Sequence, residues 1–321
     1  MSPAVQHTPV LKREALAALN VMADGAYVDA TFGRGGHSSA IVEQLSASGR
    51  LFAIDRDPRA IASATELFGD DERVKICHAA FDQMADAVDT LVDGILLDLG
   101  VSSPQLDDAT RGFSFMRDGE LDMRMDISQG ETAAQWLARV DEDDLITVLF
   151  RYGEEKFARR IARAIVEARR QNAITHTRQL ADIVVAATPK KDPHKHSATR
   201  TFQAIRIQIN QELAQIERAL PQAVRLLAPN ARLAVISFHS LEDRQVKRFM
   251  RAYATPKLPP KHVPTQALDY RTPLKLIGKA VKPSITEIDQ NARARSAILR
   301  VAERTDLGAA ELSNWEANYV G

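Results

Sequence analysis

The chain has 321 residues, more than one average domain, and its 45% hydrophobic and 26% charged content is ordinary for a soluble globular protein. The single cysteine, Cys77, excludes an internal disulfide or a cysteine-rich zinc cluster, and no run of about 18 apolar residues is long enough to span a membrane. The start of the chain lacks a signal-peptide pattern, so we expect a cytoplasmic protein. Its 42 basic residues balance 42 acidic ones, so the overall charge does not indicate a nucleic-acid partner.

The first hundred residues alternate between short apolar runs and amphipathic stretches. A helix is expected first, at 11–19. Strands are expected at 26–31, 51–54, 73–77 and 94–97, with helices at 38–45 and 59–67 between the first three. This alternation predicts an α/β fold with a doubly wound, mostly parallel sheet, in which ligands bind at the carboxyl ends of the strands.

The first predicted strand leads directly into a glycine-rich turn, DATFGRGGH at 29–37. Gly33, Gly35 and Gly36 permit positive φ and close backbone approach, and the following helix would point its N-terminal amides at a ligand. The spacing differs from the G-x-G-x-x-G fingerprint of dehydrogenases, and Asp29 before the glycines would repel a pyrophosphate. S-adenosylmethionine carries a sulfonium and an ammonium group and no phosphate, so it fits this turn better.

The second predicted strand ends in acid, in LFAIDRD at 51–57. A carboxylate about 20 residues after such glycines is typically the acceptor for ribose hydroxyls, and we assign this role to Asp55. The alternative for Asp55 is a helix N-cap. Asp57 suits the cap better, because Pro58 then takes the first helical position.

The strand expected at 94–97 leads to Asp98, whose carboxylate would face the same ligand. There it would steady a sulfonium or accept a hydrogen bond from an amine about to be methylated. The alternative is a cap of the turn before Gly100. Ser102 and Ser103 follow without the G-x-S-x-G elbow of serine nucleophiles, which favours a turn role for them.

Residues 104–206 contain no convincing strand. They contain several amphipathic helices, including those expected at 133–140, 144–150 and 156–169. The strand and helix alternation then resumes, with a helix at 212–227 and strands at 232–237 and 298–301. We therefore predict a discontinuous core of residues 1–103 and 207–321, interrupted by a helical insertion that recognises RNA.

Basic residues gather in the second half of the chain, a pattern typical of phosphate-backbone binding. For 156–170 a solvated helix face is the simpler interpretation, because a clean apolar stripe marks the other side. In 190–206, Pro189 and Pro193 interrupt a continuous helix, so the charges are expected on a loop, where function concentrates. The substrate-binding candidates in this segment are Lys190, Lys191, Lys195 and Arg200.

A third basic stretch, 244–262, carries Phe249 and Tyr253 between its charges. Aromatic rings interleaved with cations are typical of proteins that stack on unpaired bases. The pattern predicts a further contact with nucleic acid.

Six stretches together resemble one family. They are HTPVLKREAL from His7, DATFGRGGHS from Asp29, AIDRDP from Ala53, LLDLGVSSPQLDDATRGFSF from Leu96, LDMRMD from Leu121 and SFHSLEDRQVK from Ser237. With NARARSAILR from Asn291, the chain is similar over nearly its whole length to the bacterial 16S ribosomal RNA cytosine-N4 methyltransferases of the MraW type. The resemblance implies a class I, Rossmann-like methyltransferase core with a helical insertion and S-adenosylmethionine as cofactor. It implies as substrate a cytosine in the decoding region of 16S RNA, in the small ribosomal subunit or its precursor.

The family's cofactor positions carry over by resemblance onto Gly35, Gly36, His37, Asp55, Phe81, Asp98 and Gln105. No metal is expected, since no second histidine lies at helical spacing from His37 and loop packing against the cofactor suits it better. The wider class of amino-methyltransferases has a D/N/S-P-P-aromatic motif where this chain has DLGVSSP. The donor and acceptor geometry of that wider class therefore does not transfer.

The lone pair of a cytosine N4 amine is delocalised into the ring, so an acceptor must draw on the amine hydrogens while the amine is held in line with the methyl group. Asp98 is the leading candidate for this catalytic role. Phe113, Phe115 or Phe238 would stack on the base, although a phenylalanine is more often a core residue. His239 is a further pocket candidate.

The alternative functions are those of a non-catalytic RNA-binding or ribosome-assembly protein, and of a methyltransferase for a small molecule or protein. No membrane and no obligate protein partner are expected.

Overall fold

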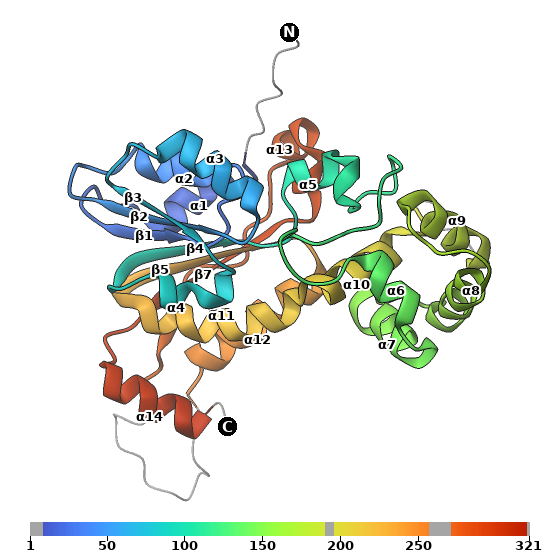
Figure 1. Cartoon of the computed structure of the whole chain (residues 1–321). Coiled ribbons are helices and arrows are strands. Elements are labelled where there is room, and N and C mark those ends of the chain that lie inside the picture. The colour runs from blue at the N-terminus through green and yellow to red at the C-terminus, as the bar shows by residue number, and fades with distance from the viewer. Residues whose placement is uncertain (1–8, 190–195, 257–270, 320–321) are drawn as a thin grey trace, which may run out of the picture. The chain divides into compact units, whose positions relative to one another are not determined.

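The computed structural model describes residues 9–189, 196–256 and 271–319 (Figure 1). It divides into two compact units, one formed by Met1–Gly100 with Leu213–Gly321 and the other by Val101–Glu212. Each unit has its own hydrophobic core. None of the helices in the described ranges combines the length and apolar character that a membrane span requires.

The first unit contains a seven-stranded sheet in the order β3-β2-β1-β4-β5-β7-β6. Its strands are β1 (Ala26–Asp29), β2 (Arg50–Asp55), β3 (Val74–His78), β4 (Val92–Asp98), β5 (Leu227–Ser237), β6 (Leu274–Leu276) and β7 (Ile298–Arg304). The first five are parallel, whereas β7 is antiparallel to both β5 and β6. The predicted doubly wound, mostly parallel sheet is confirmed, and β6 is the strand that the sequence pattern did not reveal.

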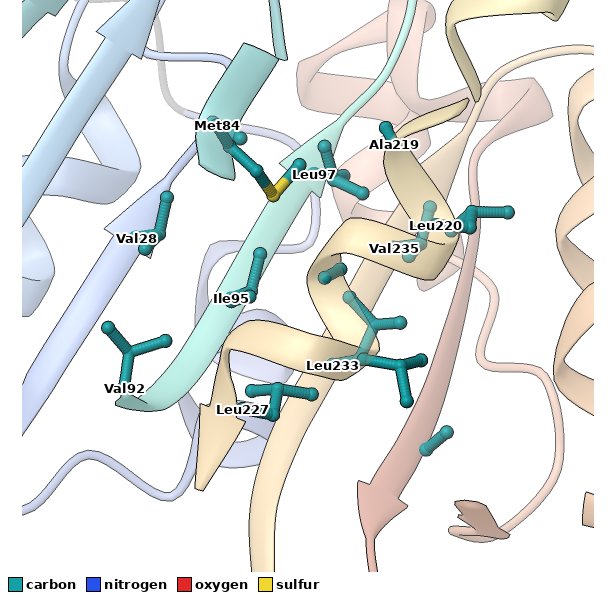
Figure 2. Close-up of a cluster of buried hydrophobic side chains, with 14 of the residues drawn as sticks. Val28, Met84, Val92, Ile95, Leu97, Ala219, Leu220, Leu227, Leu233 and Val235 are labelled. Atoms are coloured by element: carbon teal, nitrogen blue, oxygen red, sulfur yellow. The ribbon is translucent and has the colours of Figure 1, made fainter. Parts of the chain in front are cut away.

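Successive side chains of the central strands alternate between two cores. Ile95 and Leu97 of β4 join one core, and Leu96 between them joins the other. Figure 2 shows the first core, where Ile95 of β4 lies between Val28 of β1 and Val235 of β5. A strand that is buried on both faces has apolar residues at every position, so the strands appear in the sequence as continuous apolar runs.

Helices cover both faces of the sheet (Figure 1). The core that contains Leu96 is completed by residues of α1 (Lys12–Leu19), α2 (Gly36–Val42) and α3 (Pro58–Phe68). The core that contains Ile95 is completed by residues of α4 (Met84–Ala87), α11 (Glu212–Leu226), α12 (Ser240–Ala254) and α14 (Ala309–Tyr319). The short elements are η1 (Phe81–Gln83), α13 (Ile285–Gln290) and η4 (Ala292–Ser296).

The second unit is helical. It contains α5 (Ser103–Asp107), η2 (Ala109–Arg111), α6 (Ala133–Arg139), α7 (Glu142–Gly153), α8 (Ala158–Gln171), α9 (Thr177–Ala187) and α10 (Thr199–Asn210). Among its described residues the sole β-pairing is the isolated bridge between Glu120 and His176. The buried Asn210 amide holds the segment around Met125, because it accepts a hydrogen bond from the Met125 N–H at 2.8 Å and donates to the Met123 carbonyl at 2.7 Å.

Candidate functional site

Three carboxylates lie at the ends of three adjacent strands in the first unit. Asp29 ends β1, Asp55 ends β2 and Asp98 ends β4. Since β1 is hydrogen-bonded to both β2 and β4 in parallel, all three residues lie at one edge of the sheet. This is the edge at which ligands bind in open α/β sheets.

Asp29 holds the glycine-rich turn together from inside. Its side chain is 1% exposed and accepts hydrogen bonds from the Ser38 hydroxyl at 2.7 Å and from the Thr31 N–H at 3.2 Å. Burial raises the pKa of Asp29, and the nearby His37 and the two hydrogen bonds oppose this rise. Its contacts make Asp29 a support of the turn.

The turn itself requires glycine at two consecutive positions. Gly35 has φ +74°, and a Cβ built there would lie 2.6 Å from the Phe32 ring. A Cβ on Gly36 would lie 2.3 Å from Cγ of Pro9. The two glycines thus allow the backbone to turn tightly into α2, whose first residues are Gly36 and His37.

Asp55 uses one carboxylate oxygen to bind the same turn and the other to bind the connection between β2 and α3. One oxygen accepts the Gly33 N–H at 2.7 Å and the other accepts the Asp57 N–H at 2.8 Å. Burial raises the pKa of Asp55 to about 6, even though these hydrogen bonds oppose the rise. The helix N-cap is Asp57, which accepts the Arg59 N–H at 3.0 Å with Pro58 in the first helical position, so that prediction is confirmed.

His37 and Asp98 form a pair in which the histidine is buried and the aspartate side chain is 24% exposed. Nε2 of His37, a residue that is 5% exposed, lies 3.5 Å from Oδ2 of Asp98. The Thr31 hydroxyl accepts the Asp98 N–H at 2.6 Å and so fixes the backbone at the end of β4. Burial alone would lower the pKa of His37, but the interactions with Asp98 and Asp29 outweigh it and raise this pKa.

The pair leaves polar atoms unsatisfied. Within the described part of the chain, both ring nitrogens of His37 and Oδ1 of Asp98 are buried and have no hydrogen-bond partner. Buried polar groups without partners are rare in proteins, and they often mark the place of a ligand. Carboxylates at three strand ends with an open acceptor suit a ligand that carries positive charge and hydrogen-bond donors. S-adenosylmethionine has both.

Two further expected cofactor positions lie in different units. Phe81 follows β3 at the start of η1 and is half-buried against the core of the first unit. Gln105 belongs to the second unit, where its side-chain oxygen accepts the Ser102 N–H at 2.9 Å and completes a capping box of α5. The turn role expected for Ser102 thus has a direct structural basis.

Several predicted substrate contacts are packing residues. Phe113 is 6% exposed in the core of the second unit, with the Arg111 guanidinium 5.8 Å from its ring centroid. Phe115 is half-buried and stacks on His196 at 4.5 Å. Stacking of a base on Phe113 stays a prediction, although the burial of the ring favours a packing role.

The two residues after β5 form hydrogen bonds with the first turn of α12. His239 caps α12: its Nδ1 accepts the Glu242 N–H at 3.4 Å, and its Nε2 lies 3.2 Å from Oε1 of Glu242. Phe238 is half-buried against the core that contains Leu96, and its N–H donates to the Glu242 carboxylate at 2.8 Å. These contacts give both residues a structural role at the start of α12.

The third basic stretch also has a structural explanation. Phe249 and Tyr253 stack on each other with ring centroids 4.1 Å apart, and Tyr253 packs on Trp315 at 4.7 Å. Tyr253 is 2% exposed and Phe249 is partly buried, so these contacts favour a packing role for the two rings, and the contact with nucleic acid stays a prediction. Lys190, Lys191 and Lys195 lie outside the described residues. Arg200 lies on α10, where its guanidinium donates to the Glu154 carbonyl at 3.2 Å.

The sequence reasoning missed the supports of the site. Thr31 and Ser38, which hold Asp98 and Asp29, were not singled out, although Asp29 followed by Thr31 is the spacing of a local side-chain turn. The pairing of His37 with Asp98 joins distant segments, and no local pattern in a single sequence reports it.

The chain matches the model of a family described as the MraW methylase family over residues 4–305. A protein named ribosomal RNA small subunit methyltransferase H from Shewanella loihica is 56% identical over 313 residues, covering 95% of this chain and 100% of the relative. A protein of the same name from Thioalkalivibrio sulfidiphilus is 56% identical over 308 residues, covering 94% of this chain and 98% of the relative. A solved structure described as a SAM-dependent O-methyltransferase from Thermotoga maritima is 10% identical, with a TM-score of 0.40 over 94% of this chain and 69% of that one.

Proposed function

The chain belongs to the MraW methylase family, and we propose that it transfers a methyl group from S-adenosylmethionine to the N4 amine of a cytosine in the decoding region of 16S ribosomal RNA. The observation that carries the proposal is the His37–Asp98 pair, which has polar atoms without partners among the described residues. Asp98 and Asp55 end β4 and β2, the two strands that flank β1, at one edge of the sheet. The name shared by the relatives, small-subunit ribosomal RNA methyltransferase, supports the class of substrate.

The first unit supplies the residues that would hold the cofactor. Asp55 retains lone pairs beyond its two backbone hydrogen bonds, so it can accept from ribose hydroxyls at the end of β2. The backbone of Gly35 and Gly36 and the start of α2 would lie against the cofactor, and the Phe81 ring offers an apolar surface after β3. When bound, S-adenosylmethionine supplies a methyl group that the sulfonium activates. Gln105 joins this group on the strength of the family resemblance.

Asp98 acts on the amine. Its carboxylate, part of a side chain that is 24% exposed, accepts a hydrogen bond from the N4 amine and draws electron density toward the nitrogen. The N4–methyl bond would form as the bond between the methyl group and the sulfonium breaks, with the electron pair left on sulfur in neutral S-adenosylhomocysteine. The amine nitrogen then becomes cationic, and one of its two protons must leave. The partly exposed Asp98 carboxylate takes this proton and passes it to solvent, which leaves a neutral N4-methylcytosine. His37 positions the carboxylate throughout.

The test is methylation of small ribosomal subunits by the purified protein, followed by mass spectrometry of the nucleosides. We expect N4-methylcytidine to form in the wild type and to fall at least 100-fold with Asp98→Asn. Saturable RNA binding by the wild type without any N4-methylcytidine would overturn the proposal, and it would favour a non-catalytic ribosome-assembly role.

A further inference from the structure

An aromatic ring stands out from the helical unit at the end of α7. Phe150, in the last turn of this helix, is 66% exposed. Its neighbours Val148 and Leu149 are buried in the core of the unit, so α7 already has its apolar side inward and does not need Phe150 for packing. The ring is available to a partner.

Exposed cations flank this ring. Arg151 follows Phe150 directly, Lys156 lies in the connection to α8, and Arg159 and Arg160 belong to the first turn of α8. In the described ranges, no ion pair or hydrogen bond holds any of these four side chains.

Two other arginines of α8 already make contacts within the protein. Arg163 lies 3.8 Å from the carboxylate of Glu142, and the Arg169 guanidinium donates to the carbonyls of Leu137 and Val140 at 2.5 and 2.7 Å. The cations at the start of α8 thus differ from those further along it, because their side chains make no ion pair or hydrogen bond with the residues that the structure describes.

A third helix, α10, contributes a further arginine near the end of α7. The Arg200 guanidinium of α10 donates to the Glu154 carbonyl at 3.2 Å, and a Cβ on Gly153 would lie 2.7 Å from the Arg200 carbonyl oxygen. Close packing of α10 therefore brings Arg200 to the α7–α8 connection. The acidic residues of the connection are Glu154 and the buried Glu155, so positive charge prevails there.

We propose that this surface, formed by Phe150, Arg151, Lys156, Arg159, Arg160 and Arg200, binds an unpaired segment of small-subunit ribosomal RNA. A base stacks on Phe150 and the flanking phosphates contact the cations, which is how proteins bind single-stranded nucleic acid. The inference rests on the proposed function, which requires an RNA partner. It assigns RNA contact to a surface for which the sequence had favoured a solvated helix face.

The first test compares two double variants by filter binding of a 16S ribosomal RNA transcript at several KCl concentrations. Arg159→Gln with Arg160→Gln removes two charges from the surface. Arg170→Gln with Arg178→Gln removes two exposed charges from the same unit, and Arg170 lies about 16 Å along α8 from Arg159. We expect the first pair to weaken binding about tenfold at 0.1 M KCl and to reduce the salt slope by about 1.5, and the control pair to change affinity less than twofold.

The second test addresses the ring. Phe150→Ala should weaken RNA binding about five- to fiftyfold without changing the salt slope, whereas Phe150→Tyr, which keeps an aromatic face, should bind like the wild type. Circular dichroism and the melting temperature of each variant check that the fold is retained.

Equal losses for the surface and control pairs, or full RNA affinity in Phe150→Ala, would overturn this inference. The proposed function is tested separately by the wild type. If the wild type forms N4-methylcytidine while the surface variants bind RNA normally, only the surface assignment fails. If the wild type neither binds nor methylates the RNA, the proposed function itself fails.

Discussion

Nε2 of His37 lies 3.5 Å from Oδ2 of Asp98, which leaves Oδ1 as the oxygen of this carboxylate without a hydrogen-bond partner among the described residues. The two oxygens of one side chain therefore have different surroundings. Oδ2 faces the ring of His37, whereas Oδ1 is buried and has no partner among the described residues.

Asp98→Asn should reduce turnover about 100- to 1000-fold and leave RNA affinity within about twofold, because an amide is a poorer acceptor for the amine. Single-turnover methylation and filter binding measure the two effects. Asp93→Asn is the control on the same strand, since Asp93 accepts the Ala26 N–H at 2.8 Å and its loss should affect stability instead. Equal losses of turnover and RNA affinity in Asp98→Asn would point to a structural role.

The His37–Asp98 pair should make the protein sensitive to pH. The pKa of His37 in the fold is raised above its ordinary value of 6.5 by the Asp98 and Asp29 carboxylates, against burial and Lys12. The pair therefore stabilises the fold fully below about pH 6.5, and this contribution is lost as the pH rises through the raised pKa. The imidazole shifts of His37 in an NMR titration measure its pKa directly.

His37→Gln should abolish that pH dependence, both in the free energy of unfolding and in the methylation rate. His176→Gln is a control at an exposed histidine of the other unit. A His37 that titrates below 6.5, or a variant with an unchanged pH profile, would contradict the positioning role.

Cofactor affinity should depend on the ionisation of Asp55. Burial raises the pKa of Asp55 to about 6, and ribose hydroxyls bind the ionised carboxylate best. Because the folded pKa exceeds the ordinary 3.8, the unliganded protein carries a proton there below about pH 6, and affinity should fall as the pH drops through this value. Calorimetry with S-adenosylmethionine at pH 5, 6 and 7.5 measures the effect.

Asp55→Ala should weaken cofactor binding by about 1.5 to 3 kcal/mol at neutral pH, as expected for the loss of charged hydrogen bonds. Asp70→Asn, at an exposed carboxylate after α3, serves as the control. Unchanged affinity in Asp55→Ala would remove this residue from the ribose site.

Gly35→Ala tests the tight turn. Both strain at φ +74° and the 2.6 Å contact with the Phe32 ring oppose a methyl group there. Gly278→Ala isolates the first effect, because Gly278 has φ +65° and a Cβ added to it would meet nothing within 4 Å. We expect about 1 kcal/mol of destabilisation for Gly278→Ala, and clearly more, together with weaker cofactor binding, for Gly35→Ala. Equal melting temperatures for the two variants would show that crowding by Phe32 is unimportant.

The parallel sheet could be predicted because strands buried on both faces leave long apolar runs in the sequence. The three-residue strand β6 is too short to leave such a run. β5 begins at Leu227, directly after α11, whereas the apolar pattern predicted a start at 232. The residues Pro229 and Asn230 hid the beginning of that strand, since neither favours a sheet.

The candidate site was predictable only where a single short segment contains the complete motif. Asp55 and the glycine turn lie in short motifs, so their positions at the strand ends follow from local pattern. The burial of Phe113 and Tyr253 could not be predicted, because sequence does not reveal whether an aromatic ring faces a core or solvent. His239 next to Glu242 is a helix cap, which a histidine rarely forms.

The alternation of the strands constrains more than packing. Tyr27, Ala53 and Leu96 each lie two positions before Asp29, Asp55 and Asp98, and all three point into the core formed with α1, α2 and α3. Side chains two positions apart in a strand point to the same face of the sheet, so the three carboxylates share one face. A single-residue insertion within β1, β2 or β4 would turn that strand's acid to the opposite side, so lineages should tolerate length changes in these strands only in pairs.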